Sequence, residues 1–274
     1  MPELPEVESV RRGLRPLIGV PVASVRVARR DVVRDDAGRR RGRLDPGALL
    51  AGARVASIER RGKQLALIGD TGRVVLIHLG MSGQVLLGPE AGRGEHTHVV
   101  WTLGDGAKVA FRDPRRFGGV WTLPGRAALD ARWRCLGPDG LRVRAESLVE
   151  ALGRSRRAVK AALLDQRAVA GVGNIYADES LFEAGIAPSR PCDALDAPEW
   201  DRLAGAIRRV LARAVRDGGS TLRDYRRPDG SAGGAASGHK VYARAGKACS
   251  RCGGPIAGAV LAQRSTCWCP RCQH

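Results

Sequence analysis

The sequence lacks any apolar run that approaches the ~20 residues needed for a membrane-spanning helix. It also lacks the basic segment and apolar stretch of a secretory signal, because its first residues are acidic. These absences exclude a membrane partner and predict a soluble, cytoplasmic protein. The chain contains no internal repeat, and its 274 residues are enough for two domains, each with its own core.

Acidic residues are the minority charge. The chain has 28 Asp and Glu against 46 Lys and Arg, a formal net charge of +18 and a sequence pI of about 10.9. Such an excess predicts a polyanionic partner, and nucleic acid is the first candidate. An Arg-rich composition can also reflect genomic base composition, but the positive field exists in either case.

A disulfide framework is absent as well, since four of the seven cysteines form two C-x-x-C pairs that indicate metal ligands in a reducing compartment. Two such knuckles separated by sixteen residues can enclose a tetrahedral Zn²⁺. Four protein ligands leave no position for water, so we expect one structural Zn²⁺. The expected ligands are Cys249, Cys252, Cys269 and Cys272. Nearby Cys267 is predicted to be a small buried apolar residue and not a fifth ligand.

Short alternating apolar runs, separated by Gly- and Asp-rich turns, predict an all-β unit, a sandwich, in the first half of the chain. Strands are expected at 22–27, 54–58, 64–68, 73–79, 98–103, 108–111 and 119–123. Near residues 136–140 the strand pattern stops, and helices are expected at about 145–165, 174–184 and 198–216. The fold class is therefore α+β. The last helix carries apolar residues on one face and should pack into a core.

The first eight residues, Met-Pro-Glu-Leu-Pro-Glu-Val-Glu, combine a potential nucleophile with three carboxylates. Removal of Met1 would leave Pro2 with a secondary amine. An α-amino group with a pKa near ~8 is deprotonated more often at neutral pH than a lysine near ~10.4. Its condensation with an aldehyde gives an iminium that stays cationic, because no N–H remains. Helix-start chemistry is the alternative, since acids favour the positive end of a helix dipole and Pro5 suits a first turn.

Several strings, in this order along the chain, resemble motifs of the formamidopyrimidine-DNA glycosylase family. They are PELPEVE at residues 2–8, RRGKQ at 60–64, IHLGMSG at 77–83, FRDPRRFG at 111–118, GVGNIYADE at 171–179 and AQRST at 262–266. Read alone, each string also suits a structural role, such as a basic hairpin turn, a core methionine or a helix cap. The resemblance extends from Pro2 to the last cysteine pair.

The resemblance implies a bifunctional enzyme of base excision repair that excises oxidised purines and then cleaves the strand by β,δ-elimination through an iminium at Pro2. It implies that Glu3 moves a proton at the sugar, that Lys63 and Arg264 serve the catalytic site, and that Glu6 supports it. It also implies contacts with damaged double-stranded DNA. The residues that the resemblance expects to contact DNA are His78, Met81, His96, Arg115, Arg116, Phe117, Lys160, Asn174, Tyr176 and Arg264.

Within this set the resemblance assigns distinct tasks. Met81 and Phe117 enter the base stack, Arg115 faces the orphaned base, and Arg116 serves the backbone. Asn174 is expected to cap its helix and to touch the phosphate bound at the helix start. Arg264, at the tip of the zinc-finger hairpin, is expected to clamp a phosphate.

The architecture implied by the resemblance is an N-terminal catalytic β-sandwich with flanking helices (residues 1–135) and a helix-two-turn-helix domain (136–228). A flexible lesion-recognition loop (229–240) and a β-hairpin zinc finger (241–274) follow. The protein is expected to be a monomer in a bacterial cytoplasm, associated with the nucleoid through DNA.

The chain departs from the family pattern in two places. The stretch DGSAGGAASG at residues 229–238 has no aromatic residue, and Glu95-His-Thr-His98 replaces a more usual Lys-His-Asp-His. Two alternatives therefore stay open. One is an endonuclease VIII-like glycosylase for oxidised pyrimidines. The other is a non-catalytic zinc-ribbon protein that binds nucleic acid.

Overall fold

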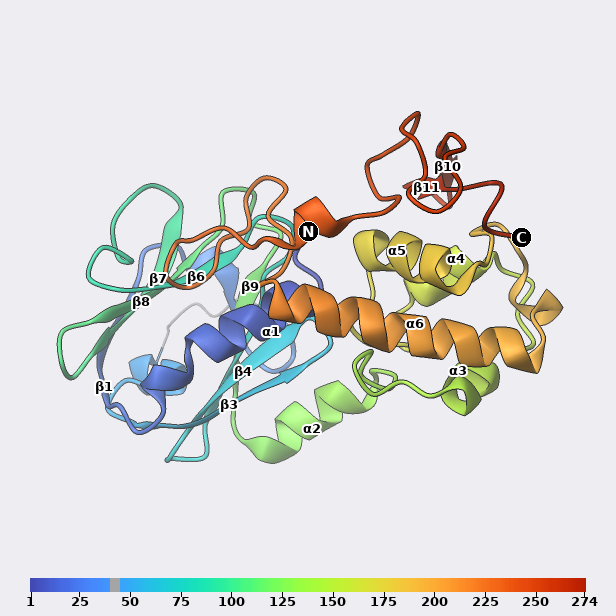
Figure 1. Cartoon of the computed structure of the whole chain (residues 1–274). Helices are drawn as coiled ribbons and strands as arrows, with labels where there is room; N and C mark the ends of the chain where they lie inside the picture. The colour runs from blue at the N-terminus through green and yellow to red at the C-terminus, as the bar shows by residue number, and fades with distance from the viewer. Residues whose placement is uncertain (40–44) are drawn as a thin grey trace. The chain divides into compact units, whose positions relative to one another are not determined.

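The structure, a computed structural model, describes residues 1–39 and 45–274 (Figure 1). Its contacts define two compact units. The first comprises Met1–Cys135 with Asp217–Gly234, and the second comprises Leu136–Arg216 with Ala235–His274. Each unit is thus built from two separate stretches of the chain. Within the described residues, no helix is both long enough and apolar enough to cross a membrane.

The first unit is a β-sandwich. One sheet has the strand order β1 (Val22–Val27), β7 (Thr97–Leu103), β8 (Lys108–Arg112) and β6 (Gln84–Leu87). The other has the order β2 (Val33–Arg34), β9 (Gly119–Leu123), β5 (Val74–His78), β4 (Gln64–Gly69) and β3 (Val55–Arg61). Buried side chains from both sheets form one core cluster, with Trp101 and Phe111 from one sheet and Leu65 and Ile77 from the other. The α+β class and the sandwich are confirmed.

Two helices accompany this sandwich. In α1 (Leu4–Gly13) the apolar spacing places Val7 and Val10 in the core cluster of the sandwich. Helix α2 (Arg126–Arg134), which buries Leu129 and Trp133, was not expected from the sequence. The indole N–H of Trp133 donates to Gln64 Oε1 at 3.0 Å and so attaches α2 to β4.

The segment Asp217–Gly234 belongs to the first unit through specific contacts. The Tyr225 side chain is buried in the core cluster of the sandwich, and the backbone N–H of Leu87 donates to Pro228 O at 2.8 Å. Local hydrogen bonds also involve the glycine- and alanine-rich stretch: Gly234 N–H donates to Asp217 O, and Arg227 N–H donates to Ser231 O.

The second unit is helical, with α3 (Ala145–Leu152), α4 (Val159–Leu163), α5 (Asn174–Ala184) and α6 (Ala197–Arg216). The expectation of one helix over 145–165 was wrong, because α3 ends at Leu152 and a separate helix, α4, begins at Val159. There the Ser155 side-chain oxygen accepts a hydrogen bond from Arg157 N–H at 3.2 Å. Serine bonds of this kind favour turns over helix continuation.

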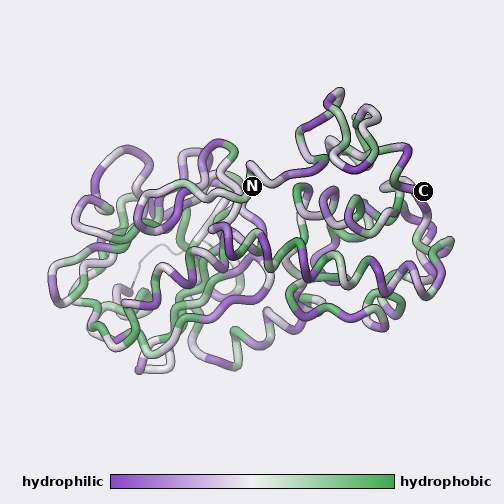
Figure 2. The backbone as a smooth tube through the Cα atoms, viewed as in Figure 1, coloured by the Kyte–Doolittle hydropathy of each residue, from purple (hydrophilic) through white to green (hydrophobic). Residues whose placement is uncertain are grey.

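The 20-residue α6 is amphipathic, as Figure 2 shows by its alternating hydrophilic and hydrophobic segments. Its buried residues include the predicted apolar set, namely Trp200, Leu203, Ile207, Val210, Leu211 and Ala214. The last two strands of the described residues, β10 (Ala257–Leu261) and β11 (Arg264–Trp268), form a hairpin. This ribbon lies between the two cysteine pairs.

Candidate functional site

The start of the chain is fixed by the first turn of α1. Pro2 is buried, and the side chains of Glu3 and Glu6 are almost fully inaccessible to solvent. Glu3 is the N-cap residue, and Glu6 Oε2 accepts a hydrogen bond from the Glu3 backbone N–H at 2.7 Å in a capping box. The structural role of these acids at the start of a helix and their predicted role beside Pro2 are therefore compatible. The same helix cap that stabilises α1 holds Pro2 next to a buried glutamate.

The second carboxylate oxygen of Glu6 attaches the helix start to a distant segment of the same unit. Glu6 Oε1 accepts a hydrogen bond from Ser220 N–H at 2.7 Å, and the Tyr225 hydroxyl donates to Glu6 O at 3.3 Å and to Gly218 O at 3.1 Å. Gly219 lies against Glu6 with φ +82°, where a side chain would be strained. Glu6 therefore holds the backbone of Glu3 with one carboxylate oxygen and the backbone of Ser220 with the other.

Lys63 occupies a tight turn between β3 and β4, in which Gly62 has a positive φ of 54°. The lysine is largely buried. The next residue, Gln64, pairs with His78 across β4 and β5. Burial first and then the positive charge of Lys63 lower the pKa of the His78 imidazole below its ordinary value. His78 should therefore be neutral at physiological pH, and its Nδ1 accepts a hydrogen bond from Gly80 N–H at 3.1 Å.

An arginine connects the Lys63 turn to α1. Arg60 Nε donates to Glu8 Oε2 at 3.0 Å, and Arg60 Nη1 donates to Gly62 O at 3.0 Å. Burial alone would raise the pKa of Glu8, but hydrogen bonds from Arg11, Arg60 and Arg12 lower it to about 2. The Glu8 carboxylate thus stays ionised and anchors the turn that presents Lys63.

Met81 lies in the loop that joins β5 to β6, and its side chain is 39% exposed. Phe117 lies in the loop that joins β8 to β9 and is 59% exposed. The Arg115 guanidinium lies 4.9 Å from the centre of the Phe117 ring, a cation–π distance. Met81, Phe117 and Arg115 thus present a thioether, a ring and a cation to solvent within the first unit.

Arg116 lies within the Phe117 loop, and His96 contacts the start of that loop. Arg116 has a positive φ of 55° and pairs with Asp31 at 3.0 Å between Nη1 and Oδ2. His96 also has a positive φ, of 63°, and its carbonyl accepts a hydrogen bond from Asp113 N–H at 3.0 Å. His96 is thereby attached to the start of the Phe117 loop.

In the second unit, the predicted anion-binding helix is α5. Its N-cap residue is Gly173, so the expectation that Asn174 caps the helix was wrong; Asn174 is the first helical residue. The Asn174 amide instead donates to Ser265 O at 3.0 Å. The cap residue, being glycine, has no side chain of its own with which to bond the helix N-terminus. Tyr176 follows on α5 and is buried.

Lys160, on α4, is also turned toward the hairpin. Its Nζ lies 2.7 Å from Asp178 Oδ1, and it donates to Ser265 O at 2.7 Å and to Thr266 Oγ1 at 2.8 Å. Asp178 Oδ2 accepts from Cys267 N–H at 3.0 Å. Lys160, Asn174 and Asp178 therefore fix strand β11 on the helices.

Strand β11 begins with Arg264, directly after a two-residue turn. Ala262 and Gln263 have positive φ values of 47° and 59°, and Leu261 pairs with Arg264. Two positive φ angles match the twist that a tight hairpin needs. Arg264 is exposed at the tip of a hairpin whose second strand is attached to α4 and α5.

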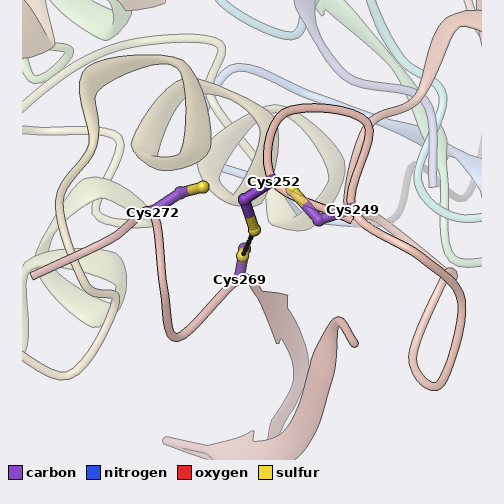
Figure 3. Close-up of side chains that lie close together, drawn as sticks. All are labelled: Cys249, Cys252, Cys269 and Cys272. Carbon is purple, nitrogen blue, oxygen red and sulfur yellow. Dashed lines mark hydrogen bonds between the residues drawn. The ribbon is translucent and has the colours of Figure 1, made fainter. Parts of the chain in front are cut away.

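The four predicted zinc ligands converge in the second unit (Figure 3). Their sulfur atoms all lie within 4.8 Å of one another, and Cys252 and Cys269 Sγ are 3.5 Å apart. A tetrahedral Zn²⁺ with bonds of about 2.3 Å places its sulfurs about 3.8 Å apart, so the four thiols fit a closed structural zinc site. Cys267 is partly buried against this cluster and is not one of the four converging residues.

Sequence reasoning missed several residues that support these groups. Asp113 is fully buried and bonds both the loop of Met81 and the loop of Phe117, although the sequence reasoning gave it no role within the FRDPRRFG string. Ser82, next to Met81, is its partner. Asp178 stood in the NIYADE string without an assigned role. The only signal in the sequence was that Ser82, Asp113 and Asp178 stand next to residues of the motifs. A motif does not show which way a side chain points, so their contacts could not be predicted.

Three family models match the chain. The formamidopyrimidine-DNA glycosylase N-terminal domain matches residues 1–120, its H2TH domain matches 136–226, and a zinc finger found in FPG and IleRS matches 246–274. The formamidopyrimidine-DNA glycosylase of Laribacter hongkongensis is 45% identical over 283 residues, with complete coverage of both chains.

The fold is also similar to solved structures of this family over nearly the whole chain. The MutM (Fpg) protein of Thermus thermophilus has a TM-score of 0.87 and 40% identity, covering 99% of this chain and 98% of that one. Lactococcus lactis Fpg in complex with abasic-site DNA has a TM-score of 0.88 and 31% identity, covering 99% of each chain.

A β-sandwich, a helix-two-turn-helix unit and a four-cysteine zinc finger on one chain define a zinc-finger DNA glycosylase. The chain belongs to the formamidopyrimidine-DNA glycosylase family, whose members are glycosylases and abasic-site lyases of base excision repair. Family membership removes the non-catalytic zinc-ribbon alternative. DNA is the partner of this class, and one structural zinc belongs to its finger.

Proposed function

We propose that this glycosylase excises oxidised purines, 8-oxoguanine and formamidopyrimidines, and then cleaves the strand through a covalent intermediate on Pro2. The observation that carries the proposal is the buried start of α1, where a capping box holds Pro2 beside the buried Glu3. Removal of Met1 is required, because the nitrogen of an acylated proline has no available lone pair.

In the proposed reaction the Pro2 nitrogen forms a bond to C1' as the damaged base leaves, and Glu3 supplies a proton to the sugar as its ring opens. The resulting iminium withdraws electrons and acidifies the C2' proton. Loss of that proton expels the 3'-phosphate, and a second elimination expels the 5'-phosphate. Water then releases Pro2 from the sugar fragment. Glu6 keeps the terminus and Ser220 in register.

The other site residues are proposed to hold DNA. Lys63, His78, His96 and Arg116 serve the backbone near the reacting sugar, while Met81, Arg115 and Phe117 fill the space left by the extruded nucleotide. In the second unit, Asn174, Tyr176 and Arg264 serve phosphate binding. Lys160 supports Arg264 through the hairpin. The enzyme is proposed to act as a monomer on chromosomal DNA in the bacterial cytoplasm.

Relatives support the choice of lesion and also keep one rival open. Lactococcus lactis Fpg has been solved with Fapy-dG-containing DNA, at 31% identity and a TM-score of 0.89. The same protein has been solved with DNA containing an oxidized pyrimidine, at the same identity and a TM-score of 0.88. The second structure is the reason to retain oxidised pyrimidines as a candidate substrate.

Borohydride trapping tests the intermediate. Enzyme whose mass confirms loss of Met1 should form a covalent adduct with an abasic duplex in the presence of borohydride. The matched control is the same protein with Met1 retained, which should bind a tetrahydrofuran duplex normally and form no adduct. Absence of any adduct with the processed enzyme would refute the proposal.

Competition between lesions tests the specificity. Duplexes with 8-oxoguanine or thymine glycol, each opposite cytosine and adenine, are cleaved in the same reaction. We expect faster cleavage at 8-oxoguanine opposite cytosine. Faster cleavage at thymine glycol would replace the purine assignment with the pyrimidine one and leave the Pro2 chemistry intact.

A further inference from the structure

The loops that carry Met81 and Phe117 cross between the same two sheets. Residues 79–83 lead from β5 to β6, and residues 113–118 lead from β8 to β9. Strands β5 and β9 pair in the five-stranded sheet, with His78 opposite Gly119. Strands β6 and β8 pair in the four-stranded sheet, with Gln84 opposite Arg112. The two loops are therefore adjacent crossovers at one edge of the sandwich.

A buried carboxylate joins these crossovers. The Ser82 hydroxyl donates to Asp113 Oδ1 at 2.6 Å, and Gly118 N–H donates to Asp113 Oδ2 at 2.8 Å. Ser82 Oγ in turn accepts a hydrogen bond from Arg115 N–H at 3.2 Å. Asp113 is fully buried and Ser82 is 2% exposed. The hydrogen bonds thus connect both ends of the Phe117 loop to the residue that follows Met81.

The loop backbones are also in direct contact. A Cβ atom on Gly80 would overlap the backbone of Phe117 and Gly118, and Gly80 has a positive φ of 60°. A Cβ atom on Gly118 would overlap His78 O and the backbone of Leu79. With no side chain between them, neither loop can shift at this contact without displacing the other.

We propose that Ser82 and Asp113 are positioning residues that make the two loops enter the DNA stack as one rigid wedge. The proposal rests on the proposed void-filling roles of Met81 and Phe117. Rigid connection means that insertion of the thioether and insertion of the ring are a single event. Without it, each side chain would insert independently, and the loss of one would leave the contribution of the other unchanged.

Double-mutant cycles measure this connection. Binding to a duplex with a tetrahydrofuran abasic analogue is compared for Met81→Ala, Phe117→Ala and the double variant, first with Ser82 and then with Ser82→Ala. Insertion is reported by 2-aminopurine fluorescence opposite the analogue. With Ser82 present, we expect the two losses to be non-additive by about tenfold in the binding constant, and in the Ser82→Ala background to be additive within about twofold.

Controls separate positioning from general stability. Thr122→Val removes a similarly buried hydroxyl of the same unit, whose partner is Arg34 O, and should leave the coupling unchanged. Asp113→Asn can accept from Gly118 N–H and donate to Ser82 and should retain most of the coupling, whereas Asp113→Ala should abolish it. Tm measurements confirm that each variant is folded.

Two negative outcomes are distinguishable. If Met81→Ala and Phe117→Ala leave binding to the analogue unchanged, the proposed void-filling function fails. If each variant weakens binding but the coupling is the same with Ser82 and with Ala at that position, the void-filling function stands and the rigid-wedge proposal is overturned.

Discussion

The Lys160 ammonium lies 2.7 Å from Asp178 Oδ1, and the two side chains are 1% and 0% exposed. Burial raises the pKa of Asp178 to about 6, although the charge and hydrogen bond of Lys160 act in the opposite direction. A buried ion pair of this kind contributes little net stability, but loss of one partner leaves an uncompensated charge. The pair is therefore best understood through its contacts with the zinc-finger hairpin.

Replacing Lys160 by Met alone should destabilise the second unit by about 3–5 kcal/mol, since Asp178 loses its partner. The double change Lys160→Met and Asp178→Leu should recover most of that stability. Because Lys160 is turned inward and acts on DNA only through the hairpin that carries Arg264, adding the double change to an Arg264→Ala protein should leave that protein's salt slope of DNA binding unchanged. A slope reduced by about one would instead indicate a direct phosphate contact. Urea unfolding and binding titrations at several salt concentrations measure both quantities.

Arg264 should behave differently from Lys160, because it is exposed at the hairpin tip. Arg264→Ala should weaken DNA binding by about 1–3 kcal/mol and lower the salt slope by about one, with Tm unchanged. Cys269→Ser is the contrasting variant. It should release zinc, disorder the finger and reduce binding and catalysis together. An Arg264→Ala protein with normal binding would remove this residue from the DNA contact.

Glu8 should make the first unit acid-sensitive. Its pKa is lowered from 4.5 to about 2 in the folded protein, so its contribution is complete above about pH 4.5 and is lost as pH falls toward 2. After allowance for solvent screening we expect about 1–2 kcal/mol at neutral pH. Urea unfolding of wild type and Glu8→Gln should differ by this amount at pH 7, and the difference should shrink below pH 4.5. A difference independent of pH would contradict the assignment.

Lys63→Ala should raise the pKa of His78, because the lysine charge is one of the two causes that lower it. As pH falls through this lowered pKa, His78 gains a proton at Nδ1 and can no longer accept the hydrogen bond from Gly80 N–H. That hydrogen bond stabilises the Met81 loop at neutral pH and should be lost in acid. NMR titration of the imidazole in both proteins measures the shift. A lower pKa in Lys63→Ala would contradict the proximity of the two groups.

Much of the fold follows from sequence patterns alone. Alternation located most of the sandwich strands, and helical spacing located α1, α5 and α6. The missed elements are those with weak local patterns. Strand β6 has four residues and β2 only two, so neither is long enough to show a period. Helix α2 is rich in Arg and Ala and is held by Trp133 against β4, a contact that depends on tertiary structure.

For the candidate site, the motifs predicted which residues belong to it but not which partners their side chains contact. Spacing located the four zinc ligands, because two C-x-x-C pairs typically bind one tetrahedral Zn²⁺. It could not show that Lys160 is turned inward to Asp178, or that Asn174 contacts Ser265 and not its own helix end. Both outcomes depend on how β11 packs on α4 and α5, and a sequence separation of 91 residues between Asn174 and Ser265 carries no local signal.

The hydrogen bond between Ser82 and Asp113 also has a consequence for the order of folding. It closes a separation of 31 residues and requires that β5 has paired with β9 and β6 with β8. Contacts of long sequence separation form late, because loop-closure entropy must be overcome before they contribute. The wedge should therefore mature only after β5 has paired with β9 and β6 with β8. A nascent or partly folded chain, although already strongly basic, would associate with DNA without the means to distort it.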